Sequence, residues 1–379
     1  MTATPRPLVD YFADLNDTRI QLKCKYDFMS IVLIVVCATI GGADDFVSMA
    51  AFARAKKEWF RKTFGLEFPD DTPPSHDTLN RVFATINPTE FGRCFLNWVE
   101  AISDRVKVKQ IAIDGKAMRG SRRKTADGYR TVQIVSAWAT ANGVTMAQVR
   151  TDEKSNEITA IPELLKLLDI SGALVSIDAA GCQKEIAAQV VAGKGDYLLA
   201  VKENQPRLYE DIEKMVQEAM EIDLLGLSQF TMQEKGHGRR ETRSCFVMEN
   251  LEDIRDRDLW KGLKSVVCML TCREVDGRES NEIRYYISNR RGGAKAFLQS
   301  SRTHWSIENS CHWVLDVAFR EDDHRLREGH APENMSLVRK MALAMLKRAD
   351  DKMGIKNKRL KAGWDDSFLE HVLLDFLDN

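Results

Sequence analysis

The chain has 379 residues, of which 44% are hydrophobic and 29% charged, and its net charge at pH 7 is −1. This length allows two or three domains with a substantial core, and the composition is ordinary for a globular protein. A chain so close to neutral is not a uniformly basic nucleic-acid-binding protein, so any surface that binds nucleic acid must be local.

The first hundred residues have helical periodicity. Their most apolar stretch, 28–40, is only 13 residues long and ends at Gly41-Gly42, so it is too short to cross a bilayer and lies too far inside the chain for a signal peptide. We interpret it as a buried helix with a glycine cap. The sequence therefore predicts a cytoplasmic protein with no membrane partner.

The helices that follow have recognisable start signals. Asp44 and Asp45 begin a helix that runs to about residue 64, Ser75 or Asp77 caps the next, and Asn87-Pro88 begins a third that ends near residue 103. Two interpretations stay open for these short helices with basic faces: a DNA-binding helix-turn-helix, or a helical bundle with a solvated basic face. We expect residues 1–105 to form an N-terminal helical domain.

The pattern changes near residue 106. Strands are expected at 106–113, 131–140 and 144–149, with a hairpin turn at Ala141-Asn142-Gly143. A helix at 161–168, a strand at 174–178, a helix at 183–191 and a strand at 197–201 follow. This order predicts an α/β fold, a mixed sheet with helices on its faces.

Residues 204–298 depart from this alternation. A charged helix at 208–220 precedes strands at 239–248, 265–273 and 283–288, which indicates a β-rich insertion. A helix at 302–319 follows, and the C-terminal part, 351–379, contains a basic run at 356–361 and an amphipathic helix.

The eight cysteines are scattered along the chain, mostly within apolar runs. Cys268 and Cys272, the closest pair, belong to one expected strand. A structural zinc site would need clustered Cys and His ligands, so reduced core thiols of a cytosolic protein are the better interpretation.

Three carboxylates carry the candidate chemistry. Asp114 and Asp178 each end an apolar strand and are followed by small residues, and a buried carboxylate there is costly unless it is paired or binds a metal. Glu308 lies on a polar stripe of the 302–319 helix that can face the ends of those strands. Three converging carboxylates need cations, and two Mg²⁺ or Mn²⁺ ions about 4 Å apart would support in-line phosphate displacement.

Two alternatives stand beside this hypothesis. The three acids could be unrelated surface or salt-bridged groups, although the similar contexts of Asp114 and Asp178 argue against it. A second acidic cluster, Glu321, Asp322 and Asp323, could supply the third ligand in place of Glu308, or form the solvated exit of the helix.

These segments also resemble a known family, the DDE transposases of bacterial insertion sequences, in the H-repeat-associated branch linked to Rhs elements. The resemblance runs over nearly the whole chain. The stretches that carry it are Ser75-His76-Asp77-Thr78-Leu79, Ile113-Asp114-Gly115-Lys116, Ser176-Ile177-Asp178-Ala179-Ala180-Gly181, Tyr197 to Gln205, Gly236 to Arg243, and His304-Trp305-Ser306-Ile307-Glu308-Asn309 with His312 to Val317.

The resemblance implies an RNase H-like catalytic domain at 106–203 plus 299–350, interrupted by the insertion at 204–298. It also implies that Asp114, Asp178 and Glu308 are the catalytic metal-binding triad. Related transposases often carry Tyr and Arg before the glutamate and Lys seven positions after it, whereas this chain has Ser301, His304 and Leu315 there. Phosphate contacts near the glutamate are therefore expected from Arg302, His304 or His312.

Other basic residues are candidate DNA contacts. The expected loop after Asp114 carries them at Lys116, Arg119, Arg122, Arg123 and Lys124, although a solvated turn would look the same. Lys202 follows the fifth strand, close to the acids. Basic residues alternate around Arg239 and Arg243, so only part of them can face DNA.

The sequence thus predicts a DNA transposase that cleaves at insertion-sequence ends and joins them to target DNA, using two Mg²⁺ or Mn²⁺ ions. Its partners would be double-stranded terminal repeats and target DNA, bound by a homodimer. An RNase H-like nuclease that cuts without joining, or a silent DNA-binding descendant of a transposase, are the alternatives.

Overall fold

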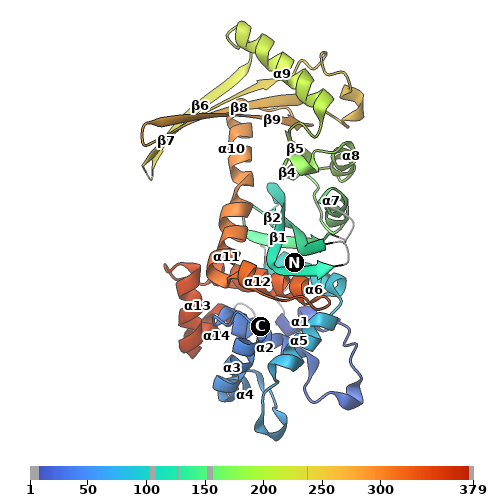
Figure 1. Cartoon of the computed structure of the whole chain (residues 1–379), viewed down its shortest axis with the longest axis vertical. Helices are drawn as coiled ribbons and strands as arrows, with labels where there is room; N and C mark the ends of the chain where they lie inside the picture. Colours follow the sequence, from blue (N-terminus) through green and yellow to red (C-terminus); the bar gives the residue numbers. More distant parts are fainter. Residues whose placement is uncertain (1–7, 103–107, 126–127, 152–156, 237, 375–379) are drawn as a thin grey trace, which may run out of the picture.

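The structure, a computed structural model, describes residues 8–102, 108–125, 128–151, 157–236 and 238–374 (Figure 1). Expectations for residues 103–107, the start of the first expected strand among them, lie outside this part. Nothing in the described part forms a helix both long and apolar enough to cross a membrane.

The N-terminal region is helical, as predicted. Its helices are α1 (Leu8–Phe12), α2 (Phe28–Ile40), α3 (Phe46–Ala55), α4 (Lys57–Phe64), α5 (His76–Thr85) and α6 (Pro88–Ile102). The buried apolar helix α2 has the predicted bounds and is capped by Gly41. Asp45 forms a capping box with Ser48 at the start of α3, and the Ser75 side chain caps α5.

The single helix expected up to residue 64 is wrong, because the chain breaks at Lys56. Lys56 ends α3 and begins α4 with φ −100° and ψ 17°, outside the helical range. After this break Trp59 and Phe60 are buried, so α4 places its aromatic side chains in the core. The burial of these aromatic side chains explains the break at Lys56, where the sequence has neither proline nor glycine.

A nine-stranded sheet forms the centre of the molecule. Its strands are β1 (Gln110–Thr125), β2 (Gly128–Ala139), β3 (Val144–Arg150), β4 (Leu174–Ile177), β5 (Asp196–Val201), β6 (Ser228–Gly236), β7 (Arg239–Met248), β8 (Ser265–Val275) and β9 (Arg278–Ser288). Their order in the sheet is β3-β2-β1-β4-β5-β9-β8-β7-β6. The first five strands, with α7 (Glu157–Lys166) and α8 (Lys184–Ala192) between them, have the predicted order, and the mixed α/β fold is confirmed.

The strands of 204–298 continue this sheet. After α9 (Pro206–Glu221) come β6 to β9, and β9 pairs antiparallel with β5 from Leu198↔Ser288 to Val201↔Tyr285. Strand β6 was not predicted from the sequence, because most of its side chains are exposed and its polar and apolar residues alternate only weakly.

Helices cover both faces of the sheet (Figure 1). On one face lie α7, α8 and α9. On the other lie α10 (Ala294–His304), α11 (Trp313–Phe319) and α12 (Ala331–Arg348), and α12 lies between the sheet and the N-terminal helices α2 and α5. Helix α12 is buried almost throughout and was not predicted. The chain ends in α13 (Ile355–Trp364) and α14 (Asp366–Leu374), beside the N-terminal helices.

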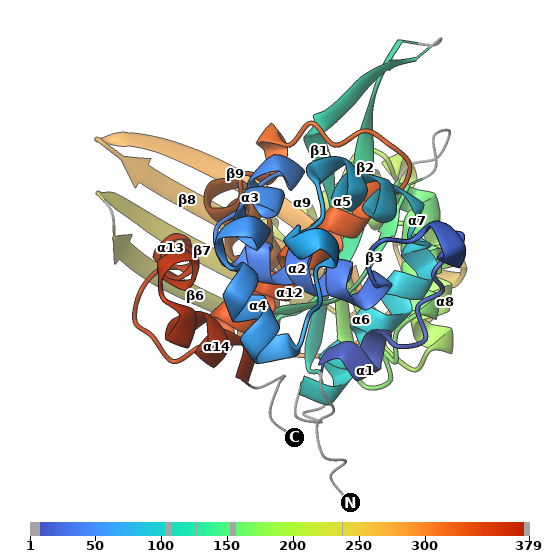
Figure 2. The same cartoon turned by 90° about the horizontal axis from the view of Figure 1, so that it is seen from below.

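Two contacts fix these layers. Arg359 on α13 donates to the carbonyl of Thr39 at 3.0 Å and pairs with Asp44 at 2.9 Å, which ties the C-terminal helices to α2. Phe297 and Leu298 on α10 pack with Cys245 of β7 in a second, smaller core. The β1–β2 hairpin projects beyond the body of the protein (Figure 2).

Candidate active site

The register of the sheet places two aspartates side by side. β1 and β4 are parallel and pair Ile113 with Ile177, so Asp114 and Asp178 are the next residues on adjacent strands. Asp178 directly follows β4, where its carboxylate accepts hydrogen bonds from the amides of Ala180 at 3.1 Å and Gly181 at 3.4 Å. These bonds fix its orientation.

Asp114, in contrast, is not the last residue of its strand. β1 continues to Thr125 because β2 pairs with it along the projecting hairpin, from Ile111↔Ala139 to Thr125↔Gly128. The loop expected after Asp114 is therefore strand, and Lys116 and Arg119 belong to β1. The prediction failed because charged residues at the tip of a projecting hairpin have the composition of a loop.

A third acid, Glu157 in the first turn of α7, lies near the two aspartates. A Cβ atom added to Gly115 would stand 2.0 Å from its Oε1, so the Glu157 carboxylate rests on the β1 backbone next to Asp114. Burial and the charges of Asp178 and Asp114 raise the pKa of Glu157. Sequence reasoning missed this residue, since acids in the first turn of helices are common for another reason, the helix dipole.

Burial, and after it the charge of Asp114, also raises the pKa of Asp178. The edge of the sheet therefore concentrates negative charge, and a divalent cation with oxygen ligands would relieve this repulsion. The donor set of Asp114 and Asp178 fits Mg²⁺ or Mn²⁺ in its chemistry.

Glu308 is exposed and lies on an interrupted helix. The continuous helix expected at 302–319 is wrong: α10 ends at His304, and Glu308–His312 form a π-helical turn before α11. The wider turn buries Cys311 and His312 together while keeping Leu315 and Phe319 in the core.

The structure does not gather the three predicted ligands around one point. In the described ranges no three His, Cys, Asp or Glu side chains lie close enough together to hold one ion. The two aspartates are adjacent, while Glu308 lies on a separate element. The charges of all three acids act on His304, where they oppose the burial that lowers its pKa.

Two histidines that were predicted as DNA contacts lie near the aspartates. His312 is buried, with its Nδ1 at 3.3 Å from Oδ2 of Asp114. His304 lies with its Nδ1 at 3.1 Å from the hydroxyl of Ser176, to which Gln110 donates a hydrogen bond at 3.0 Å. Burial lowers the pKa of His304, although the nearby carboxylates oppose this shift.

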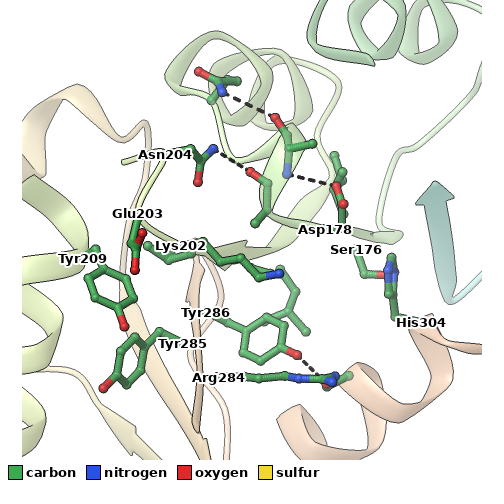
Figure 3. A pocket seen from close by; sticks show the side chains of 18 of the residues that line it. Ser176, Asp178, Lys202, Glu203, Asn204, Tyr209, Arg284, Tyr285, Tyr286 and His304 are labelled. Atoms are coloured by element: carbon green, nitrogen blue, oxygen red, sulfur yellow. Dashed lines mark hydrogen bonds between the residues drawn. The ribbon is translucent and has the colours of Figure 1, made fainter. Parts of the chain in front are cut away.

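A cleft of about 980 Å³ opens beside Asp178 (Figure 3). Lys202 extends into its middle from the end of β5, as Figure 3 shows, and is exposed, so this predicted residue shares a cleft with Asp178. The wall opposite carries aromatic and cationic side chains that sequence reasoning did not identify. They are Tyr209, Arg284, Tyr285, Tyr286 and Trp305.

Lys116 is engaged in ion pairs within the protein. Its ammonium pairs with Asp316 and, at 2.8 Å, with the buried Glu321. Burial alone would lower the pKa of Lys116, but the negative charges of Glu321 and Asp316 outweigh this effect and raise the pKa. Arg119 is 83% exposed and lies 3.4 Å from Asp322.

The second acidic cluster is occupied by cations of the protein. Glu321 is buried against Lys116 and Arg339, and these charges outweigh burial and lower its pKa to about 2. Asp322 pairs with Arg119, and Asp323 pairs with Arg320 at 3.0 Å. Of the remaining predicted DNA contacts, Arg239 and Arg243 lie on β7, and Arg302 lies in the last turn of α10.

Comparison with known proteins gives the family. Residues 109–345 match the family described as "Transposase DDE domain", and residues 9–99 match "DDE_Tnp_1-associated". "Putative transposase YncI" of Escherichia coli O157:H7 is 42% identical over 97% of this chain and 94% of its own length. "H repeat-associated putative transposase YhhI" of E. coli K12 is 36% identical over 97% and 98%.

Among solved structures, a piggyBac transposase synaptic complex with hairpin DNA aligns with a TM-score of 0.42 and 9% identity, over 100% of this chain and 83% of that one. On the sequence matches, this chain belongs to the transposase DDE domain family, so the resemblance stated above is confirmed.

Proposed function

We propose that this transposase cuts phosphodiester bonds at the ends of an insertion sequence and joins them to target DNA, with Asp114 and Asp178 at its catalytic centre. The observation that supports this most is the parallel register of β1 and β4. It sets two carboxylates at adjacent positions, and one of them, Asp178, lines the cleft. Burial and mutual repulsion make this pair costly unless it serves a cation.

The metal ligands in this proposal are Asp114, Asp178 and Glu308, holding two Mg²⁺ or Mn²⁺ ions. When bound, such ions supply activation of the attacking oxygen and stabilisation of the leaving oxygen in an in-line displacement. Glu157 is the second candidate for the third ligand, because its pKa already responds to both aspartates whereas Glu308 is exposed on a π-helical turn.

The other side chains of the cleft have supporting roles. Lys202 projects into the cleft and would contact a phosphate of the bound DNA. Ser176 holds the His304 ring, and burial favours its neutral form, so His304 would add no charge beside the acids. The amides of Ala180 and Gly181 fix the orientation of the Asp178 carboxylate.

The DNA partners are the terminal repeats and the target duplex. Joining requires two ends to be brought together, and we therefore propose that a homodimer acts on the DNA. The hydroxyl freed by cleavage would attack the target phosphate by the same in-line route, so no covalent protein–DNA intermediate is needed.

The test is cleavage and strand transfer on a labelled terminal-repeat duplex with Mg²⁺ or Mn²⁺. Asp114→Asn and Asp178→Asn should each lower cleavage by roughly 100-fold or more while the melting temperature stays within a few degrees. Asp253→Asn, at an exposed turn of the insertion, is the matched control and should keep full activity.

Comparing Glu308→Gln with Glu157→Gln assigns the third ligand, because only the true ligand should match the aspartate variants. Full activity in either aspartate variant refutes the proposal. Cleavage without joined product would indicate a nuclease, and DNA binding without cleavage would indicate a silent descendant.

A further inference from the structure

One face of the outer sheet gathers arginine side chains. The register aligns Glu234 with Glu241 and Glu241 with Arg273 across β6, β7 and β8. It also aligns Arg243 with Thr271 in the next row. Side chains in such rows alternate between faces, and these lie on the face that packs against α10, together with Cys245. The arginines on it are Arg239, Arg243, Arg273, Arg278 and Arg284, joined by Arg302 of α10.

We call these six arginines, with Glu234, Glu241 and Glu282, the arginine face. Their formal charges leave an excess of positive charge. The opposite side of the same strands has a different balance, since its row aligns Lys235, Arg240, Glu274 and Glu279, two cations and two acids. Positive charge is therefore concentrated on the α10 side of the sheet, within a chain of net charge −1.

Glu241 lies beneath the arginines and is only 4% exposed. It pairs with Arg243 and, at 2.6 Å, with Arg273, while Arg239 lies 3.9 Å away. Burial would raise the pKa of Glu241, but these guanidinium groups outweigh it and lower the pKa. A buried acid among several arginines acts as a fixed support that holds their charges in place.

Glu234 makes similar pairs but is 39% exposed. One of its oxygens lies 2.5 Å from Arg243 and the other 2.8 Å from Arg302, so it connects β7 to α10. A DNA phosphate could bind there in the same way, with one oxygen to each of the two arginines. The position of Glu234 is therefore one that a phosphate oxygen could take over.

The arginine face continues into the cleft beside Asp178. Arg302 and His304 lie two residues apart on α10, and His304 lines that cleft. The Arg284 guanidinium stacks over the Trp305 ring at 4.8 Å, and both residues also line the cleft. A DNA backbone lying on the face would therefore lead to the acids.

We propose that the arginine face binds the DNA backbone, with Glu241 as a permanent positioning residue for the arginines and Glu234 as a substitute for phosphate that DNA displaces. This inference rests on the proposed function, in that DNA is the substrate. It assigns opposite roles to two glutamates on neighbouring strands, which makes it testable by substitutions of identical chemistry.

The experiment measures binding of the full-length protein to a fluorescein-labelled 30-base-pair duplex by anisotropy, in EDTA, between 50 and 200 mM salt. Arg243→Gln should weaken binding about tenfold and lower the salt slope by about one. Glu241→Gln should weaken binding as well, since the arginines lose their support. Glu234→Gln should instead tighten binding about threefold or more, because no carboxylate then competes with phosphate.

Arg240→Gln is the matched control on the opposite side and should bind within about twofold of wild type. Melting curves check that each variant is folded, and if Glu241→Gln unfolds, the Glu234→Gln and Arg243→Gln pair still decides. Weaker or unchanged binding in Glu234→Gln overturns the inference, and so does an equal loss in Arg240→Gln.

The failure of this inference is distinguishable from failure of the proposed function. If wild type binds and cleaves DNA while the arginine-face variants behave like wild type, only the inference fails. If wild type does not bind the duplex, both fail.

Discussion

Replacing Glu321 with glutamine should strongly destabilise the protein. Glu321 is 1% exposed and is the carboxylate shared by Lys116, at 2.8 Å, and Arg339, at 3.6 Å. Glutamine keeps the shape but removes the charge, so the buried Arg339 loses this counter-charge and Lys116 keeps its pair with Asp316 alone of the two strong ones. Breaking a buried ion pair from one side typically costs about 3–5 kcal/mol.

The pKa of Glu321 gives a similar magnitude. A carboxyl whose pKa falls from its ordinary 4.5 to about 2 on folding contributes about 3 kcal/mol at neutral pH. Because the folded pKa is the lower one, this contribution is complete above pH 4.5 and is lost as the pH falls toward 2. The difference between wild type and Glu321→Gln should therefore shrink over that acid range.

Urea unfolding at pH 7, 4 and 3 measures this prediction. Asp323→Asn is the control two residues away: its carboxylate is 65% exposed in a surface pair with Arg320, so the change should cost under about 1 kcal/mol. A loss below about 1 kcal/mol for Glu321→Gln at pH 7, or a difference that grows on acidification, would refute the reasoning about the buried network.

Two further predictions concern neighbouring positions. Gly120→Ala should lower the free energy of unfolding by about 2 kcal/mol, because the added Cβ would stand 2.1 Å from the backbone oxygen of His324. Gly92→Ala on helix α6 is the control: its Cβ would meet no atom within 4 Å, so the change should be neutral or stabilising by up to about 1 kcal/mol. Urea unfolding measures both. Burial, with the charge of Arg339, lowers the pKa of His324 to about 4, so only the unfolded chain takes up a proton as the pH falls from 6.5. The free energy of unfolding of wild type should fall by about 2–3 kcal/mol between pH 7 and 4.5 because of His324. His324→Gln should remove most of that loss, and an unchanged pH dependence would contradict the assignment.

The parts of the fold that follow local rules were predictable. Helix α2 and the start of α5 follow from an apolar run and a capping serine, and the β-β-β-α-β-α-β order follows from periodicity. Helix α12 was missed because it is buried all round, so its Arg339 and Lys340 side chains serve tertiary contacts and obscure an amphipathic pattern.

The candidate site was predictable in part. Strand-end patterns identified Asp114 and Asp178, whose adjacency then depends only on parallel pairing. The contribution of Glu157, and of the histidines beside the aspartates, arises where separate elements meet, and no single segment carries a signal for it. The same holds for Lys116, whose partners are 200 and 205 residues away in the chain.

The pairing of β9 with β5 limits how the protein can be shortened. Excising 204–298 and joining the flanks would turn the interior strand β5 into an unpaired edge strand. Its side chains are apolar, and its backbone amides and carbonyls would lack partners. An exposed edge strand of this kind pairs with strands of other chains, so the truncated protein would tend to aggregate. Residues 204–298 therefore complete the central sheet. Their outer strands can change in sequence, but β9 has to be retained because it covers the edge of β5.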